Sequence, residues 1–409
     1  LIDTVKGFSR MNENISNESS QKFPMRPVAP LGVIAMNGCE EMGRRVNEYL
    51  MNWQVDSSSD QKLHSFYGSD KNGFLLEAHC PRFGTGEGKG MIADSVRGYD
   101  LFIICDVGAY QCTYKLYGRE IPMTPDEHYA DLKRIIAAVS GKAYRINVIM
   151  PMLYEGRQHR RTSRESMDCA VMLQELVNMG VSNIITFDAH DPRVQNAIPL
   201  SGFESIMPTY QMLKAMCHTY DDLRIDKHHM MVISPDEGAL NRNIYYSSAM
   251  GVDMGMFYKR RDYTRVVNGR NPIVAHEYLG DSVEGKDVFV ADDIIASGDS
   301  ILDLAYNLKR RKAKRVFAGA TFAFFTSGLE AFDKAYAEGV IDHVFATNLT
   351  YTPQEVLDRP WFSQADMSKY MAFVIATLNH DQSLSYLLNP WNRIEKLLTK
   401  YRADHPVED

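Results

Sequence analysis

The chain has 409 residues, a formal net charge of −7 and hydrophobic residues at 45% of its positions. This length is more than one domain usually needs, and the apolar content is enough for a sizeable core. The negative charge offers no basic surface of the kind that binds nucleic acid. No apolar run approaches the length of a membrane span. We therefore expect two domains or more in a protein that acts on neither nucleic acid nor membranes.

The cysteines and the N-terminal residues indicate the cellular compartment. The six cysteines are scattered without a C-x-x-C pair, and most lie in or beside apolar runs. This pattern disfavours a zinc site and is typical of buried thiols in a reducing compartment. Residues 1–30 are polar and lack the apolar stretch of a signal peptide. We expect them to form an N-terminal extension, and we expect a cytoplasmic protein.

Short apolar runs alternate with helical patterns along most of the chain. The runs that we expect to form strands are 31–36, 100–106, 145–150, 183–187, 230–233, 254–258, 288–291, 315–325 and 343–347. A helix is expected from residue 37 to about Leu50, followed by a polar loop over 52–72. Another helix is expected from Thr124-Pro125 to Val139, and most of 370–400 is expected to be helical. Such alternation predicts parallel sheets of the doubly wound type, which bind ligands at the carboxyl ends of their strands.

Polar residues follow four of these expected strands. They are Asp188 with His190, Asp236, Lys259 with Arg261, and Asp292 with Asp293. Each cluster alone has an ordinary structural explanation, but four of them at successive strand ends favour a binding site. Carboxylates and an imidazole can share Mg²⁺ with a phosphate, and cations on a closing loop can neutralise a transferred phosphoryl group.

The segment VFVADDIIASGDS, residues 288–300, combines several of these features. A buried strand over 288–291 is followed by the acid pair, and a small polar loop over 296–300 precedes an amphipathic helix. Backbone N–H groups at such a helix start bind phosphate, while the acids can hold sugar hydroxyls or Mg²⁺. An ordinary strand-to-helix turn with surface aspartates is the alternative.

Two further loops have more than one interpretation. The basic loop 154–165 offers Arg157 and Arg164 for phosphate or for stacking on a base, or it is a solvated charged loop. The glycine-dense segment 83–90 has the composition of a tight hairpin. No Ser-His-Asp or Cys-His arrangement indicates covalent catalysis. From the residues alone we infer a Mg²⁺-assisted transfer that involves a nucleotide phosphate and a phosphorylated sugar.

The segment 288–300 resembles the phosphoribosyl-diphosphate-binding signature of the type I phosphoribosyltransferase fold. Three further stretches narrow the resemblance. They are Gly156-Arg157-Gln158 with Ser163-Arg164-Glu165, Phe187-Asp188-Ala189-His190, and Ser234-Pro235-Asp236 with Lys259-Arg260-Arg261. In this order and spacing, over about residues 31–388, the chain resembles the ribose-phosphate diphosphokinase family, also called phosphoribosyl diphosphate synthetases.

The resemblance implies an α/β fold of two stacked phosphoribosyltransferase-like domains, each a doubly wound parallel sheet, related by a pseudo-two-fold. It divides the chain into an N-terminal extension (1–30), an ATP-side domain (31–206), a ribose 5-phosphate-side domain (207–388) and a C-terminal helical extension (389–409). It also implies a homo-oligomer built from dimers, with a hexamer as one candidate.

The implied activity is a Mg²⁺-dependent step of nucleotide biosynthesis. The diphosphoryl group of ATP passes to the anomeric hydroxyl of ribose 5-phosphate, giving 5-phosphoribosyl 1-diphosphate and AMP. The resemblance assigns ATP binding to Arg157, Gln158, His190, Phe83 and Glu87, and metal binding to His190 and Asp236. It assigns ribose 5-phosphate binding to Asp292, Asp293, Ser297, Gly298 and Ser300, and catalysis to Lys259 and Arg261. Phe83 and Glu87 match a loop that reaches the adenine in a neighbouring subunit, which revises the plain hairpin interpretation of 83–90.

The chain departs from the family pattern at several positions. Ala296 replaces an acid in the phosphate loop, and Asp299 places a carboxylate where glycine or alanine is usual. Thr85 replaces an aspartate, and His159 also replaces an acid. Two alternative functions therefore stay open: a non-catalytic regulatory paralogue that binds nucleotides, and a phosphoribosyltransferase that acts on a base.

Overall fold

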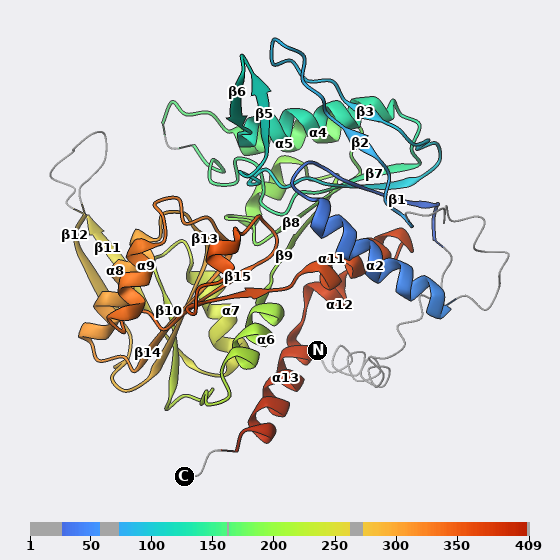
Figure 1. Ribbon diagram of the computed structural model, residues 1–409. Helices are drawn as coiled ribbons and strands as arrows, with labels where there is room; N and C mark the ends of the chain where they lie inside the picture. Colours follow the sequence, from blue (N-terminus) through green and yellow to red (C-terminus); the bar gives the residue numbers. More distant parts are fainter. Residues whose placement is uncertain (1–26, 58–72, 162, 262–272, 407–409) are drawn as a thin grey trace.

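The computed structural model describes residues 27–57, 73–161, 163–261 and 273–406. Two sheets organise the chain, one above the other in Figure 1. The first is fully parallel, in the order β1 (Leu31–Ala35), β4 (Asp100–Ile104), β7 (Arg145–Ile149), β8 (Asn183–Phe187) and β9 (Gly202–Ile206). Fully buried strands such as β4 explain why these segments are apolar throughout instead of alternating.

The second sheet has seven strands. Their order is β12 (Ile273–Leu279), β11 (Asp253–Arg261), β10 (Met230–Ser234), β13 (Asp287–Ile295), β14 (Arg315–Ala323), β15 (His343–Thr347) and β16 (Phe362–Ala365). Only the pair β11–β12 is antiparallel among the pairs described in this sheet. Two short hairpins are added to the first unit: β2 (Ala78–His79) with β3 (Met91–Ile92), and β5 (Thr113–Leu116) with β6 (Arg119–Pro122).

Helices cover both faces of each sheet. One face of the first sheet packs on α4 (Pro125–Val139) and α5 (Asp168–Asn178), and the other on α2 (Glu40–Ser57) and α11 (Ser368–Asn379). The second sheet lies between α8 (Asp299–Arg310) with α9 (Glu330–Ala337) and α6 (Thr209–Thr219) with α7 (Leu240–Met250). The other helical segments within the described residues are η2 (Pro192–Ala197), α10 (Gln354–Leu357), α12 (Ser385–Leu388) and α13 (Trp391–Asp404). The predicted α/β fold with parallel sheets is confirmed.

Local signals account for several element boundaries. The α4 helix begins with a capping box between Thr124 and Glu127 and has Pro125 in its first turn, as the sequence predicts. The expected end of a helix near Leu50 is wrong, because α2 continues to Ser57. Its last turns have tertiary support, since the ring of Trp53 stacks on Phe373 of α11 with centroids 4.2 Å apart. The expected polar loop 52–72 lies outside the described residues after Ser57.

Two late helices of the chain pack on different units. The α11 helix leaves the second sheet and packs beside α2 on the first sheet. Ile394, Leu398 and Tyr401 of α13 join the core of the second sheet on the side of α6 and α7. The division of the chain at 206 and 388 remains a prediction, and of these two helices α11 is the one that joins the second unit to the first.

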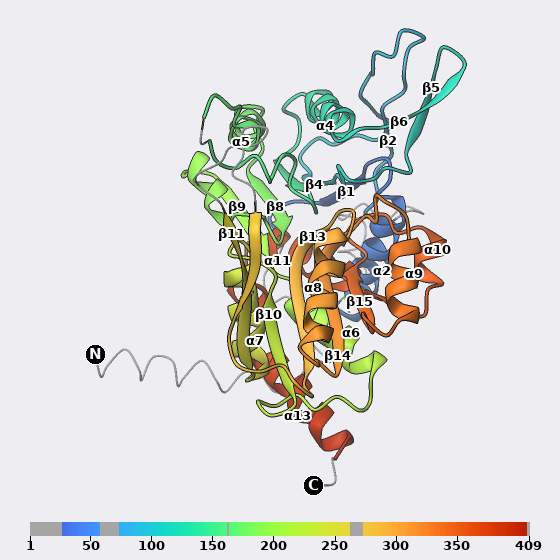
Figure 2. The ribbon, with the colours of Figure 1, turned by 90° about the vertical axis from the view of Figure 1, so that its left-hand side faces the viewer.

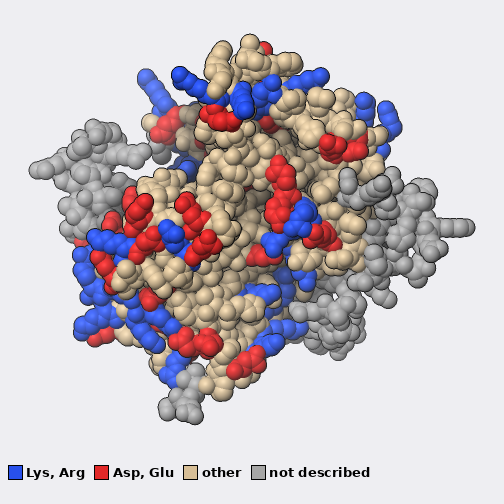
Figure 3. Space-filling view, in the orientation of Figure 1, with Lys and Arg blue, Asp and Glu red and all other residues tan. Residues whose placement is uncertain are grey.

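The surface agrees with the modest net charge. On the face drawn in Figure 3, Lys and Arg side chains are interspersed with Asp and Glu. None of the helices described is both long enough and apolar enough to span a membrane.

A buried carboxylate fixes α11 to the first sheet. Asp100 is fully buried and accepts hydrogen bonds from Arg145 (2.8 and 2.7 Å), Asn147 (2.8 Å) and Asn379 at the end of α11 (3.0 Å). Without Arg145 this carboxylate would keep only neutral donors. We expect Arg145→Met to lower the free energy of unfolding by about 3–5 kcal/mol, because one partner of a buried ion pair is removed. Chemical denaturation measures this loss. The matched control is Arg44→Met on the exposed face of α2, which should change little; equal effects of both variants would contradict the prediction.

A second carboxylate links the units near the sheet edges. Asp106 follows β4 and accepts hydrogen bonds from Thr350 Oγ1 (2.8 Å) and from the Gly108 amide (2.9 Å). Burial raises the pKa of Asp106 to about 6. The folded protein therefore keeps a proton that the unfolded chain has lost between pH 4 and 6, so this group makes stability fall as the pH rises through that window.

Asp106→Asn should remove this contribution, which is on the order of 3 kcal/mol. The measurement is the urea midpoint of both proteins at intervals from pH 4 to pH 7. We expect the wild type to lose stability relative to the variant from pH 4 to 6, with a constant difference above that. Parallel curves over the whole range would contradict the assignment.

Candidate active site

The carboxyl ends of strands from both sheets meet in the middle of the molecule. Asp188 and His190 follow β8 of the first sheet, while Asp292 and Asp293 lie near the end of β13 in the second. Figure 2 shows β8 and β9 at the level of the upper ends of β11 and β13 of the second sheet. His190 Nδ1 lies 2.7 Å from Asp293 Oδ2, which joins the two units by a direct hydrogen bond. Two of the four polar clusters predicted from the sequence are thus in contact.

The acid pair lies inside its strand. The β13–β14 pairing continues from Asp292 opposite Ala320 to Ile295 opposite Ala323, so β13 ends at Ile295 and not before Asp292. The expected strand end at Ala291 is therefore wrong. Asp292 and Ile294 pair with β14 on either side of Asp293, and the Asp293 amide donates to Asp292 Oδ1 (2.9 Å), so the backbone around both acids is held in place.

The two acids differ in their environments. Burial and the neighbouring Asp293 raise the pKa of Asp292. Burial alone would also raise the pKa of Asp293, but the hydrogen bond from His190 and the charge of Arg242 hold it well below its ordinary value. The bond to Asp293 in turn raises the pKa of His190 against the effect of burial. The contacts with His190 and Arg242 therefore favour the ionised form of Asp293, while burial and the charge of Asp293 oppose ionisation of Asp292.

The phosphate loop is short and begins a helix. Only residues 296–298 separate β13 from α8, which begins at Asp299. Gly298 has φ +92°, and a Cβ there would lie 2.2 Å from the Phe332 ring, so glycine is required by both conformation and space. The amides at the start of α8 can face an anion. Ser300 is exposed in the first turn of this helix.

Asp299 lies directly at this helix start. The hydroxyl of Ser297 donates a hydrogen bond to Asp299 Oδ2 over 2.9 Å. The Asp299 side chain is exposed, and its carboxylate is held on the loop that the sequence predicts to bind phosphate. The negative charge therefore remains close to the expected anion.

The expected ATP-binding residues lie in several places. Arg157 is exposed in the loop after β7, and Gln158 donates its side-chain amide to Ser166 O (3.0 Å). Phe83 and Glu87 close a hairpin by a backbone hydrogen bond of 2.8 Å, and Phe83 is 57% exposed. This hairpin joins β2 to β3 at the outer edge of the first unit in Figures 1 and 2. It is not part of the cluster around His190 in its own chain.

The remaining predicted residues are Asp236, Lys259 and Arg261. Asp236 follows β10 and accepts hydrogen bonds from the amides of Gly238 (2.9 Å) and Ala239 (3.1 Å). This turn directs α7 towards the site. Lys259 and Arg261 belong to β11 by their backbone, but their side chains lie outside the described residues.

The donor set constrains how a metal could be held. Across the described parts of the chain, no three His, Cys, Asp or Glu side chains cluster in a way that could hold an ion. His190 has committed Nδ1 to Asp293, so Nε2 is the ring atom left to face a ligand. Mg²⁺ commonly takes one or two protein ligands and completes its shell with phosphate and water. The site fits an ion that arrives with a phosphate ligand.

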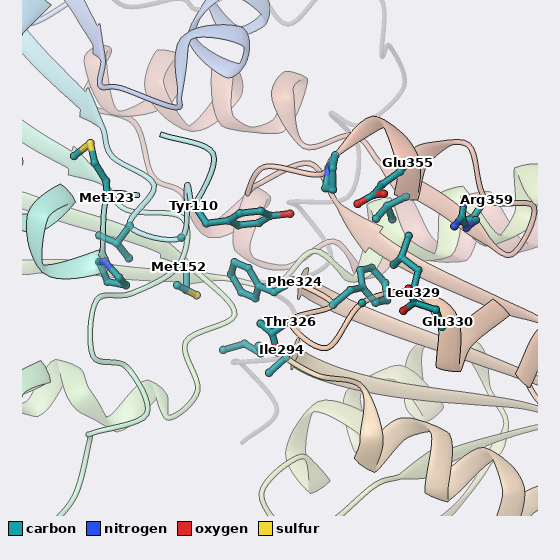
Figure 4. A pocket seen from close by; sticks show the side chains of 18 of the residues that line it. Tyr110, Met123, Met152, Ile294, Phe324, Thr326, Leu329, Glu330, Glu355 and Arg359 are labelled. Carbon is teal, nitrogen blue, oxygen red and sulfur yellow. The ribbon is translucent and has the colours of Figure 1, made fainter. Parts of the chain in front are cut away.

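A cavity of about 670 Å³ borders the phosphate loop. Arg157, Tyr110 and Met152 of the first unit and Ala296, Phe324 and Glu330 of the second are among its lining residues. In Figure 4, Tyr110 and Phe324 lie in the centre of the cavity, with Met123 and Met152 on one side and Glu330 and Arg359 on the other. The cavity connects the expected nucleotide residue Arg157 with the loop that follows the acid pair.

Sequence reasoning missed one residue at the centre of the site. Arg242 of α7 donates two hydrogen bonds from Nε (3.0 and 2.9 Å) and one from Nη2 (2.8 Å) to the carboxylate of Asp188. Its Nη1 lies 3.6 Å from Asp292 and its Nη2 lies 3.8 Å from Asp293. An arginine on a helix usually indicates a solvated surface. The available signal was its position six residues after Asp236, on the helix that this turn begins.

Comparisons with known proteins place the chain in a family. Residues 31–180 match the family model of the N-terminal domain of ribose phosphate pyrophosphokinase, and residues 206–347 match the phosphoribosyl transferase domain model. Ribose-phosphate pyrophosphokinase of Vibrio cholerae is 30% identical over 319 residues, covering 77% of this chain and 92% of the relative. The protein of that name from Pasteurella multocida is 30% identical over 317 residues, covering 76% of this chain and 90% of the relative.

A solved structure shares the fold of this chain. The crystal structure of phosphoribosylpyrophosphate synthetase from Mycobacterium smegmatis matches with a TM-score of 0.67 at 19% identity, over 86% of this chain and 99% of that one. This neighbour supports the two-domain α/β fold. The predicted resemblance is confirmed: the chain belongs to the ribose-phosphate pyrophosphokinase family of diphosphotransferases, which is the same family as the ribose-phosphate diphosphokinases.

Proposed function

We propose that this chain transfers the diphosphoryl group of ATP to the anomeric hydroxyl of ribose 5-phosphate. The observation that supports this most directly is the 2.7 Å bond between His190 and Asp293. It places an imidazole from one unit beside the acid pair and phosphate loop of the other, so two substrates can meet at one junction. The named activity of the relatives agrees with this arrangement.

The second unit would hold the sugar phosphate. The 5-phosphate would face the amides at the start of α8, with Ser297, Gly298 and Ser300 around it. Asp292 and Asp293 would accept hydrogen bonds from the ribose hydroxyls, for which a rigid acid pair within β13 is well placed. Ground-state binding of this kind brings the anomeric oxygen to a fixed position.

The first unit would hold the nucleotide. Arg157 and Gln158 would bind ATP, and His190 Nε2 would face its phosphates together with Mg²⁺, which Asp236 would help to place. Magnesium would supply charge neutralisation on the β- and γ-phosphoryl oxygens. Phe83 and Glu87 would reach the adenine in a second copy of the chain, because their hairpin points away from the site of its own chain. A homo-oligomer is therefore part of the proposal.

The proposed transfer is a displacement at the β-phosphorus of ATP. The anomeric oxygen attacks the β-phosphorus of ATP, and the bond between that phosphorus and the oxygen bridging to the α-phosphorus breaks. AMP leaves with that oxygen and its electron pair, and the hydroxyl proton passes to solvent water. Lys259 and Arg261 would stabilise the negative charge on the transferred group.

The six described cysteines are all free, in keeping with a cytoplasmic location.

The direct test is product formation. Purified chain with Mg²⁺, ATP and ribose 5-phosphate should produce AMP and 5-phosphoribosyl 1-diphosphate in equal amounts, measured by chromatography. Lys259→Ala should reduce the rate by about 100-fold or more, because a group that stabilises the transition-state charge is lost. Absence of AMP above this variant would reject the proposal and favour the non-catalytic regulatory paralogue, for which Asp299 on the phosphate loop is the supporting observation.

Asp299→Asn tests how the phosphate loop tolerates its carboxylate. Removing a charge of the same sign as the 5-phosphate should lower the Michaelis constant for ribose 5-phosphate by about 3- to 10-fold, with little change in that for ATP. The matched control is Asp303→Asn, an exposed acid four residues further along α8. An unchanged constant in the Asp299 variant would show that the carboxylate does not act on the substrate.

A further inference from the structure

Arg242 is the charged side chain around which the junction of the two units is arranged. It extends from α7 of the second unit, and only 9% of its side chain is exposed. Its partner Asp188 belongs to the first unit and is 3% exposed. Nε and Nη2 both donate to this carboxylate, so the pair has the two-pronged geometry that fixes the orientation of a guanidinium.

The other edge of the same guanidinium faces the acid pair. Nη1 lies 3.6 Å from Asp292 Oδ1, and Nη2 lies 3.8 Å from Asp293 Oδ1. One rigid plane therefore interacts with three carboxylates from two sheets. These longer distances are those of ion pairs and leave the oxygens of Asp292 and Asp293 able to accept other hydrogen bonds. A lysine ammonium is a compact charge and does not reproduce this fork.

Asp188 is itself held in place. Thr321 of β14 donates to Asp188 Oδ2 over 2.6 Å, and the carbonyl of Thr321 accepts a hydrogen bond from Thr347 of β15 (2.6 Å). The backbone of Asp188 has φ +44°, a left-handed conformation that is uncommon for residues other than glycine. The backbone of Asp188 is strained, and both oxygens of its buried carboxylate already accept hydrogen bonds from Arg242 and Thr321. This carboxylate is therefore not free to ligate a metal or a substrate. Its contacts serve to anchor Arg242.

We propose that Arg242 is a positioning residue for ribose 5-phosphate. It sets the orientation of Asp292 and Asp293 towards the sugar. Its hydrogen bonds to Asp188 couple that orientation to the segment after β8, which also contains His190. The sugar half and the nucleotide half of the site are thereby held in one geometry. This inference rests on the proposed function, because it concerns the same acid pair.

The test compares Arg242→Lys, Asp188→Asn and the double variant with the wild type. Lysine at position 242 keeps the positive charge but cannot form the two-pronged pair with Asp188. Asparagine at position 188 removes the charged partner of Arg242 but leaves Arg242 in place. Each single variant should raise the Michaelis constant for ribose 5-phosphate by about 10-fold or more and that for ATP by less than about 3-fold. The double variant should be no worse than the stronger single variant, because both changes disrupt one arrangement.

A matched control separates positioning from stability. Arg315 is also mostly buried and also forms a two-pronged pair, with Asp287 (2.9 and 2.7 Å), but this pair lies at the opposite end of β13. Arg315→Lys should lower the unfolding midpoint to a similar extent and leave the Michaelis constant for ribose 5-phosphate unchanged. All kinetic measurements are made well below the unfolding midpoint of each variant.

The outcomes distinguish this inference from the proposed function. If the wild type produces no AMP, the proposed function fails, and the positioning role fails with it because it concerns the same acid pair. If the wild type is active and Arg242→Lys has an unchanged Michaelis constant for ribose 5-phosphate, the positioning role is rejected. Equal increases in the constants for both substrates, or the same increase in Arg315→Lys, would also overturn it and leave Arg242 a structural residue.

Discussion

The arrangement of the site depends on burying several negative charges where two sheet edges meet. Asp188 belongs to the first unit and Asp292 and Asp293 to the second, and carboxylates this close together disfavour one another's ionisation unless a cation lies between them. Arg242 lies between all three, and His190 adds a second positive partner at Asp293. Because Asp188 takes the strongest bonds, the acid pair retains capacity for a ligand.

The junction is also held from a distance. The α11 helix follows the second sheet in the chain but packs on the first, and Asn379 at its end reaches Asp100 in β4. Asp106 and Thr350 form another bond between the units beside the cavity. These contacts limit how far the units can separate, since opening the site would disrupt buried groups on both sides.

The sequence was sufficient for the fold class and for the edge at which the polar clusters gather. Alternating apolar runs predict parallel sheets, and parallel sheets place strand ends together. Local patterns were less informative about where each strand and helix ends. The β13 strand continues through its acid pair because β14 pairs with it. The α2 helix continues to Ser57 because Trp53 packs on a helix 320 residues away in the chain. Both depend on long-range partners that a local window does not contain.

The position of Arg242 in the site likewise depends on partners that are distant in the chain. Its role depends on three carboxylates that lie 54, 50 and 51 positions away in the chain, and nothing adjacent to it distinguishes it from a surface arginine. Asp188 shows the converse, since a strand-end acid beside His190 has the pattern of a metal ligand but is fully engaged by Arg242 and Thr321. The neighbouring acids that remain open to a ligand are those with longer contacts to the guanidinium. Residue type and position therefore indicate where polar groups gather, while the hydrogen-bond partners distinguish a carboxylate that is already engaged from those that can still accept a ligand.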